Sequence, residues 1–222
     1  MSVLSADELV DRIYRHDAAD PKRIFIVPTP RREGIKDTSI DLMLGNHFIV
    51  TRTARFRALD AYSEETEKDI ALYQERVLIP FGEQLILHPG TFILGVTWQY
   101  IGLPNDIHAQ VVTRSTWGRA GLTVATAVVV HPCFSGCLTL ELVNNGNAPI
   151  ALYPGSRVAH IIFMHAEPGK TIPVTGASKY FGMTEPGFTK LHDERPELER
   201  WKQIGRHVSF QTGSDSEDNA VS

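Results

Sequence analysis

Between residues 77 and 165 the chain alternates short β-branched and aromatic runs with turns rich in glycine, proline and asparagine. The turn signals are Phe81-Gly82, His88-Pro89-Gly90, Leu103-Pro104-Asn105, Asn144-Asn145-Gly146 and Tyr153-Pro154-Gly155. Short strands at this spacing are typical of an all-β sandwich or barrel. We expect core strands at Phe92–Tyr100, Gln110–Thr113, Thr123–Val130, Cys137–Val143 and His160–His165. The pattern predicts a mostly β fold with a few short helices.

The N-terminal part of the chain adds smaller elements. Ser5 and Glu8 have capping-box spacing, which predicts a helix that runs to about Tyr14. A short strand is expected at Arg23–Val27, and strand–turn character returns at Asp41–Val50. The segment Ser63–Arg76 is dense in charge and is expected to be an exposed insertion, either a solvated loop or a poorly fixed helix.

The C-terminal part turns polar after Gly176 and shows a short helical stretch around Glu197–Ile204. Residues 211–222 have a composition typical of disorder. We therefore expect one domain over residues 1–190 with a β core at about 35–182, an extension with a short helix over 191–210, and a disordered tail over 211–222.

Composition limits the partners. The 222 residues carry 22 Lys and Arg against 26 Asp and Glu, a formal charge of −4. A nucleic-acid polymer is not an expected partner, because phosphate backbones favour clustered basic residues, although a local phosphate site remains compatible. No apolar run reaches the roughly 18 residues that a membrane-spanning helix needs. We expect a soluble cytoplasmic protein with no membrane partner, in which Cys133 and Cys137 are free thiols.

Glu141 is the first candidate for chemistry. Along Cys137–Leu142 the period of two puts three leucines on one face and Cys137, Thr139 and Glu141 on the other. A carboxylate on such a strand can act as a general base if partial burial raises its pKa and a cation keeps it ionised. A polar strand face in water explains the same pattern.

The segment Arg114–Arg119 is a candidate phosphate site. It holds two arginines with Ser115, Thr116 and Gly118, which offer guanidinium, hydroxyl and backbone N–H donors to an anion. A helix start capped by Ser115 or Thr116 is the alternative interpretation. Beside Glu141, this segment would supply both a phosphate cradle and an ion-pair partner for the acid.

A zinc-dependent deaminase site is not supported. Cys133 and Cys137 are separated by three residues rather than two, and the H-x-E motifs, at His165 and His192, follow the cysteines instead of preceding them. No metal-ligating residues are therefore predicted.

Several motifs in consistent order resemble the dCTP deaminase family of the trimeric dUTPase-like superfamily. The main matches are Thr113–Leu122 (TRSTWGRAGL), Pro132–Cys137 (PCFSGC) and Leu140-Glu141. Supporting matches are Ser39–Phe48, Leu87–Gly90, Leu103-Pro104, Leu152–Gly155 and Ser178–Tyr180. The resemblance implies a distorted jelly-roll or β-barrel subunit, a homotrimer with active sites at subunit interfaces, and zinc-independent conversion of dCTP to dUTP.

The resemblance also implies residue roles. Glu141 would be the general base, Ser115 and the backbone carbonyl of Ala127 would position water and the leaving amine, and Arg119 would keep Glu141 ionised. The implied nucleotide-binding residues are Arg114, Ser115, Thr116, Trp117, Gly118, Arg119, Ala127, His131, Thr139, Leu140, Glu141, Lys179 and Tyr180. Mg²⁺ would be bound through the triphosphate, and dTTP is a candidate feedback inhibitor.

Two positions depart from the family pattern. His131 stands where an Asp usually contacts the deoxyribose, and Met183 falls where a ligand-contacting Gln is usual. A neutral imidazole supplies no fixed negative charge, which argues against an added dUTP diphosphatase step. A bifunctional deaminase and diphosphatase, and a nucleotide-binding regulator without catalysis, remain the alternatives.

Overall fold

The computed structural model describes residues 2–15, 17, 19–52, 58–125, 129–167 and 182–214. These residues group into two units, one formed by residues 1–51 and 76–187 and the other by residues 52–75 and 188–222. The segment 52–75 therefore groups with residues 188–222.

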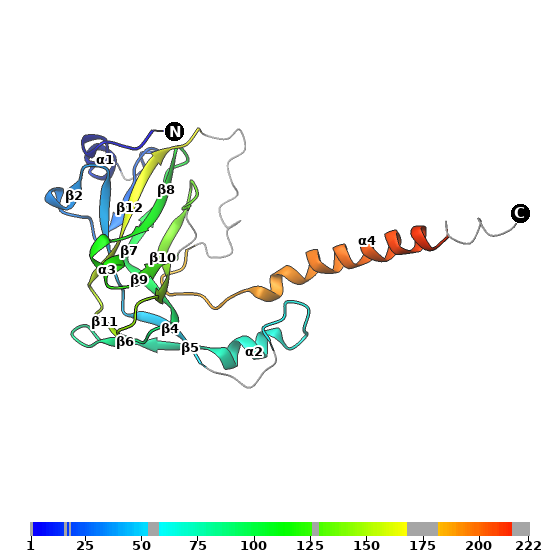
Figure 1. The fold of residues 1–222 in the computed structure, drawn as a ribbon. Coiled ribbons are helices and arrows are strands. Elements are labelled where there is room, and N and C mark those ends of the chain that lie inside the picture. The colour runs from blue at the N-terminus through cyan, green and yellow to red at the C-terminus, as the bar shows by residue number, and fades with distance from the viewer. Residues whose placement is uncertain are drawn as a thin grey trace, which may run out of the picture. The chain divides into compact units, whose positions relative to one another are not determined.

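The first unit is mostly β, as predicted, and consists of antiparallel sheets (Figure 1). One sheet has the order β5-β4-β7-β10-β9, with β1 also paired to β7, and another has the order β2-β3-β12-β8. The short strands β6 and β11 form a third pair. The strands are β1 (Phe25–Val27), β2 (Ile35–Lys36), β3 (Ser39–Met43), β4 (His47–Thr51), β5 (Gln74–Leu78), β6 (Leu85–Leu87), β7 (Phe92–Gly102), β8 (Ile107–Thr113), β9 (Leu122–Val124), β10 (Ser135–Asn144), β11 (Ile150–Leu152) and β12 (Arg157–His165).

The predicted core strands are present with shifted ends. The expected strand at Thr123–Val130 is shorter than predicted: β9 ends at Val124, residues 126–128 lie outside the described part, and Val130 forms an isolated bridge with Ala109. The core is built from alternate strand residues, and its largest fully buried side chains include Phe48 and Phe163.

The predicted N-terminal helix is α1 (Ala6–Ile13), and the Ser5 hydroxyl accepts a hydrogen bond from the Glu8 amide at 3.3 Å as expected for a capping box. Leu4, just before α1, donates its amide to the Phe163 carbonyl of β12 at 3.0 Å. The unit also contains the 3₁₀ turn η1 (Arg32–Gly34) and the helix α3 (Ser115–Arg119).

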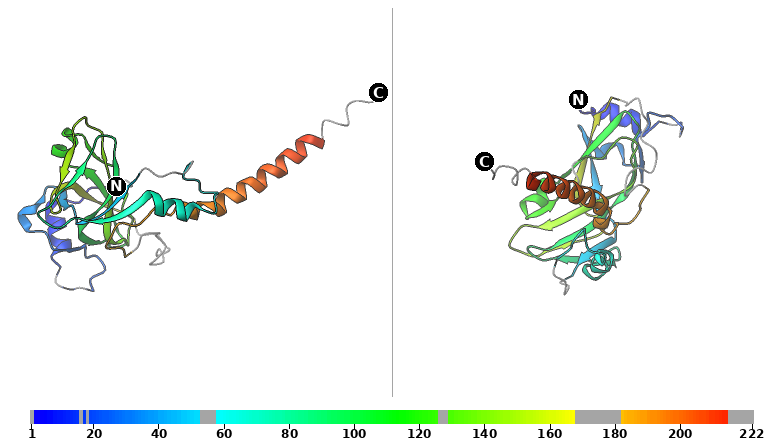
Figure 2. Two further views of the ribbon diagram at one scale, coloured as in Figure 1. Left: turned by 90° about the horizontal axis from the view of Figure 1, so that it is seen from below. Right: turned by 90° about the vertical axis from the view of Figure 1, so that its right-hand side faces the viewer.

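The second unit contains α2 (Thr66–Tyr73), the 3₁₀ turn η2 (Leu191–Glu194) and α4 (Arg195–Ser214). The Gln74 side chain accepts from the Thr189 amide at 2.9 Å, which joins the insertion to the extension. Two expectations need correction. The helix around Glu197–Ile204 is not short but spans 20 residues (Figure 2), and it continues to Ser214, four residues into the segment expected to be disordered.

Candidate active site

The first part of the candidate site is the segment that leaves β8. Arg114 has extended backbone and occupies the N-cap position of α3 without making a side-chain cap bond. The helix-start interpretation is therefore correct for the backbone, whereas the predicted cap by Ser115 or Thr116 is wrong, because both lie inside the helix. The Arg114 amide donates to the Val158 carbonyl at 3.0 Å, and the Trp117 indole donates to the Arg157 carbonyl at 2.8 Å. Both bonds attach the segment to the start of β12.

The far end of this segment is fixed by a close approach of two backbones. Gly121 has a φ of +96°, and a Cβ placed there would lie 2.6 Å from backbone atoms of Gly146. Asn145 donates its amide to the Gly121 carbonyl at 2.8 Å. The turn after β10 therefore holds the C-terminal end of α3, which ties the segment to the strand that carries Glu141. The sequence signal for this contact was Gly121 within the motif and Gly146 within a turn.

Glu141 lies in the middle of β10, between β7 and the chain that continues from β9. Its backbone pairs with Leu94, and its carbonyl accepts from the Ala125 amide at 2.8 Å. The predicted alternation is confirmed: Leu138, Leu140 and Leu142 are buried, whereas the other face is half-buried. Desolvation by burial raises the pKa of the Glu141 carboxyl above its ordinary value. The environment is thus the one that a general base needs, a carboxylate partly removed from water.

Glu141 and Arg119 do not meet within one chain. Arg119 and the neighbouring Ser115 and Thr116 are exposed. The described part of the chain offers the Glu141 carboxylate no hydrogen bond or ion pair, and desolvation is the cause of its pKa shift. The predicted ion pair is therefore absent from the single chain.

The other predicted site residues differ in accessibility. Thr139 shares the half-buried face of Glu141, whereas Leu140 is fully buried on the opposite face and can offer a ligand only its backbone. His131 is exposed, beside the bridge residue Val130. Ala127, Lys179 and Tyr180 lie outside the described residues.

The cysteine segment, Pro132–Cys137, leads into β10. Cys133 and Cys137 are free, as predicted, and burial raises the pKa of the Cys137 thiol. The Cys137 amide donates to the Met183 carbonyl at 2.8 Å, so Met183 contributes its backbone to the edge of β10. Among the described residues, no three His, Cys, Asp or Glu side chains come together as a metal site.

Sequence reasoning missed Asp41 on β3. Its carboxylate lies 3.0 Å from Arg114, 3.2 Å from Arg157 and 3.0 Å from the His160 ring. The sequence signal for Asp41 was a single acidic residue at the centre of an apolar strand, within the matched segment Ser39–Phe48. Its contacts depend on the pairing of β3 with β12, which local patterns do not reveal.

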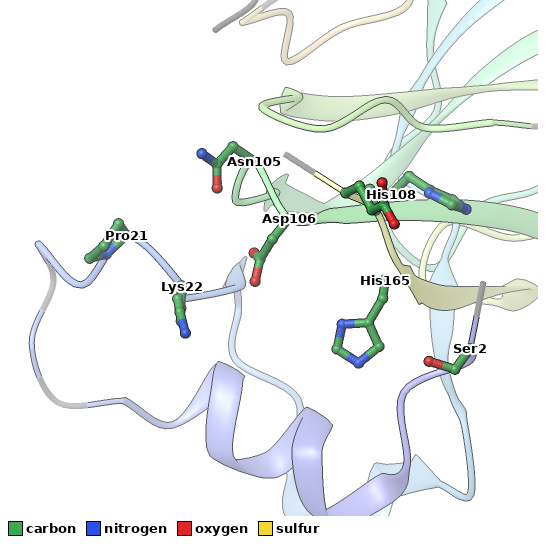
Figure 3. Close-up of a pocket in the computed structure, with 9 residues that line it drawn as sticks. Ser2, Pro21, Lys22, Asn105, Asp106, His108 and His165 are labelled. Atoms are coloured by element: carbon green, nitrogen blue, oxygen red, sulfur yellow. The ribbon is translucent and has the colours of Figure 1, made fainter. Parts of the chain in front are cut away.

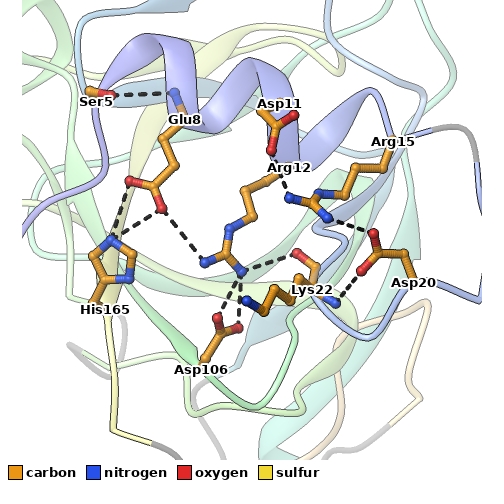
Figure 4. A network of polar contacts seen from close by, with 9 residues as sticks. All are labelled: Ser5, Glu8, Asp11, Arg12, Arg15, Asp20, Lys22, Asp106 and His165. Atoms are coloured by element: carbon orange, nitrogen blue, oxygen red, sulfur yellow. Dashed lines mark hydrogen bonds and ion pairs between the residues drawn. The ribbon is translucent and has the colours of Figure 1, made fainter.

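A separate cavity of about 940 Å³ lies beside α1 (Figure 3). It is lined by Ser2, Pro21, Lys22, Asn105, Asp106, His108, His165, Ala166 and Glu167. The polar network beside it centres on Arg12, which donates to Asp106 at 2.9 and 3.0 Å and to the Lys22 carbonyl at 3.1 Å (Figure 4). None of the residues predicted for the active site lines this cavity, and the network ties α1 to the rest of the first unit.

Comparison with known proteins identifies the class. A model of the dCTP deaminase-like family matches residues 3–166, and the chain belongs to this family. It is 42% identical over 142 residues to a dUMP-forming dCTP deaminase of Methanobrevibacter smithii, with 64% of this chain and 72% of that protein covered. It is 37% identical over 164 residues to a dCTP deaminase of Haloarcula marismortui, with 72% and 83% covered.

The fold agrees with this membership. A crystal structure of the 2′-deoxycytidine 5′-triphosphate deaminase of Agrobacterium tumefaciens matches with a TM-score of 0.53 at 18% identity, over 72% of this chain and 46% of that one. That likeness concerns the fold alone. No described helix is long and apolar enough to cross a membrane.

Proposed function

We propose that this chain catalyses the hydrolytic deamination of a cytosine deoxynucleotide, dCTP and water giving dUTP and ammonia. The observation that carries the proposal is the partly desolvated Glu141 at the centre of β10, in a chain whose relatives are named dCTP deaminases. Its raised pKa lets it accept a proton from water and return it within the same cycle.

The chemistry follows from one carboxylate. Glu141 takes a proton from water, the hydroxide adds to cytosine C4, and the proton passes to N3. The C4–N4 bond then breaks with a second proton transfer, and the amine leaves as ammonia, which leaves uracil. In this proposal Ser115 and the Ala127 carbonyl hold the water and the leaving amine, with no zinc.

Among the described residues Arg119 and Glu141 do not pair with each other, which supports a further part of the proposal, a homotrimer with interface active sites. An exposed Arg119 on one subunit can pair with the Glu141 carboxylate of a neighbour and keep it ionised. Each site would then be complete only in the assembled protein.

The triphosphate is proposed to lie against Arg114, Ser115 and Thr116, with Lys179 and Tyr180 as further nucleotide-binding residues. Arg and hydroxyl donors fit phosphate oxygens, and Mg²⁺ usually keeps several waters and binds through substrate phosphates, so the ion would be carried by the nucleotide. Bound Mg²⁺ would neutralise part of the polyphosphate charge. Because dTTP shares the deoxyribose and triphosphate, it is a candidate inhibitor at the same site.

The second candidate function is a bifunctional enzyme that also hydrolyses dUTP to dUMP and pyrophosphate. The 42% identical relative is named dUMP-forming, which favours it. The exposed imidazole of His131 offers no fixed negative charge for that step, which favours dUTP as the final product.

A product assay separates these functions. Purified protein is incubated with Mg²⁺ and each of dCTP, dCMP, CTP and dUTP, and ammonia, uracil nucleotides and pyrophosphate are measured. The proposal predicts ammonia and dUTP from dCTP, and no pyrophosphate from dUTP. Pyrophosphate release would establish the bifunctional enzyme, and nucleotide binding without ammonia from any cytosine nucleotide would favour a non-catalytic regulator.

A further inference from the structure

One carboxylate, that of Asp41, serves three basic side chains. Its Oδ2 accepts from Arg114 at 3.0 Å and from Arg157 at 3.2 Å, and its Oδ1 lies 3.0 Å from Nδ1 of His160. The Asp41 side chain is 19% exposed and that of Arg114 is 23% exposed, so this ion pair is largely removed from water. A partly buried charge-assisted bond restricts a guanidinium far more than an exposed one does.

The sheet places these residues together. Asp41 on β3 lies directly opposite His160 on β12, and β12 separates β3 from β8, the strand that leads into Arg114. The Arg114 backbone is already attached to β12 through Val158. Asp41 on β3 therefore fixes the side chain of a residue whose main chain is fixed by β12.

Asp41 is itself held from the other sheet. The buried side-chain amide of Gln99 on β7 donates to the Asp41 carbonyl at 3.1 Å, and its oxygen accepts from the Met43 amide at 2.9 Å. The Asp41 carboxylate thus extends from a backbone that is hydrogen-bonded to Gln99 on both sides of Leu42. Such support is what a precisely held ligand group requires.

The charge balance leaves the cluster positive. Two guanidinium groups share one carboxylate, so Arg114, Arg157 and Asp41 together keep a net charge of about +1. Asp41 bonds to Nη1 of Arg114, and among the described residues no other side chain takes the remaining guanidinium donors, which can bind an anion. The carboxylate holds the arginine without neutralising the cluster.

We propose that Asp41 is a positioning residue that orients Arg114 toward the polyphosphate of the nucleotide, an inference that rests on the phosphate role of Arg114 in the proposed function. A freely moving Arg114 would have to lose its side-chain entropy on binding, whereas the held one has already lost it. Asp41 therefore acts on nucleotide binding more than on the chemical step.

The test is a double-mutant cycle between Asp41→Asn and Arg114→Gln, with binding of Mg²⁺-free tripolyphosphate measured by calorimetry. D41N is expected to weaken binding about tenfold, the loss expected for one charge-assisted hydrogen bond. On the R114Q background the same change should have no further effect, because Asp41 acts through Arg114. With dCTP, D41N should raise KM and leave kcat within about twofold.

Asp106→Asn is the matched control. Asp106 is 18% exposed and pairs with Arg12 in the same unit. The D106N variant therefore loses an ion pair of similar burial, but beside α1 and away from Arg114. It should lower the melting temperature as D41N does and leave tripolyphosphate binding unchanged. If D41N does not fold, Asp41→Glu keeps the charge but moves it by one methylene, and it should show the same dependence on Arg114.

Tighter or unchanged tripolyphosphate binding in D41N would overturn the inference, as would equal losses on the wild-type and R114Q backgrounds. The proposed function fails separately. If the coupling is present and dCTP yields no ammonia, Asp41 positions Arg114 in a protein that is not a deaminase. If ammonia release is normal and the coupling is absent, only the positioning role is wrong.

Discussion

The side-chain amide of Gln99 joins the two main sheets by donating to the backbone carbonyl of Asp41 at 3.1 Å. Gln99 is 3% exposed, and its other amide atom accepts from Met43. Because the buried Gln99 amide bonds to backbone groups of β3, it fixes the position of that strand. It thereby also fixes the position of the Asp41 carboxylate, which bonds to Arg114.

Gln99→Leu should therefore destabilise the protein by about 1 to 3 kcal/mol, because two partly buried backbone groups lose their partners. The measurement is urea unfolding followed by circular dichroism. Gln84→Leu is the control, since Gln84 is exposed and pairs only with the Tyr153 hydroxyl among the described residues; its effect should be below about 0.5 kcal/mol. Equal losses in the two variants would contradict the role of Gln99.

Gly121→Ala should lower the free energy of unfolding by about 1 to 3 kcal/mol, because the backbone at this position has a φ of +96°. The clash of the added Cβ with the Gly146 backbone should lower it further. Since this contact holds the end of α3, activity should fall as well. Gly34→Ala is the control: it has open space around its Cβ position. Thermal unfolding of both variants checks the prediction, and a wild-type melting curve for Gly121→Ala would refute it.

The pH dependence of activity should report Glu141. Desolvation raises the pKa of its carboxyl, the proposed pairing with Arg119 lowers it, and a general base must be ionised, so kcat/KM should fall as the pH drops through the pKa of Glu141. Arg119→Gln removes the proposed cation and should move this acid limb to higher pH. Arg200→Gln, an exposed change in α4, should not move it. An acid limb that is identical with and without Arg119 would exclude the pairing.

The Cys137 thiol should react slowly with alkylating reagents. Burial raises its pKa, so less thiolate is present at pH 8, and the thiolate is the reactive form. Cys133→Ser isolates it for measurement with iodoacetamide and mass spectrometry. The rate should lie below that of a free cysteine peptide and rise as the pH passes 9; a rate equal to that of the peptide would be inconsistent with the burial.

Local patterns predicted β10 well. The alternation of Leu138, Leu140 and Leu142 with polar residues is a short-range property of a half-buried strand, and it placed Glu141 on the correct face. The length of α4 was underestimated, because the polar composition of residues 211–214 suits both a helix end and a disordered tail.

Long-range contacts were not predictable in the same way. Asp41, Arg114 and His160 come together only through the pairing of β3 with β12, and no local pattern specifies which strands become neighbours. The separation of Glu141 from Arg119 in one chain has the same origin: matched motifs indicate shared function, but they do not say whether the two residues belong to one subunit.

The most direct test of the account is ammonia release from dCTP by the wild-type protein and by Glu141→Gln, alongside nucleotide binding by calorimetry. The account predicts ammonia and a uracil nucleotide in equal amounts from the wild type. It predicts loss of turnover by about a hundredfold or more in the variant, the contribution typical of general acid–base catalysis, with dCTP binding retained. Full activity in Glu141→Gln, or no ammonia from a wild-type protein that binds dCTP, would contradict it.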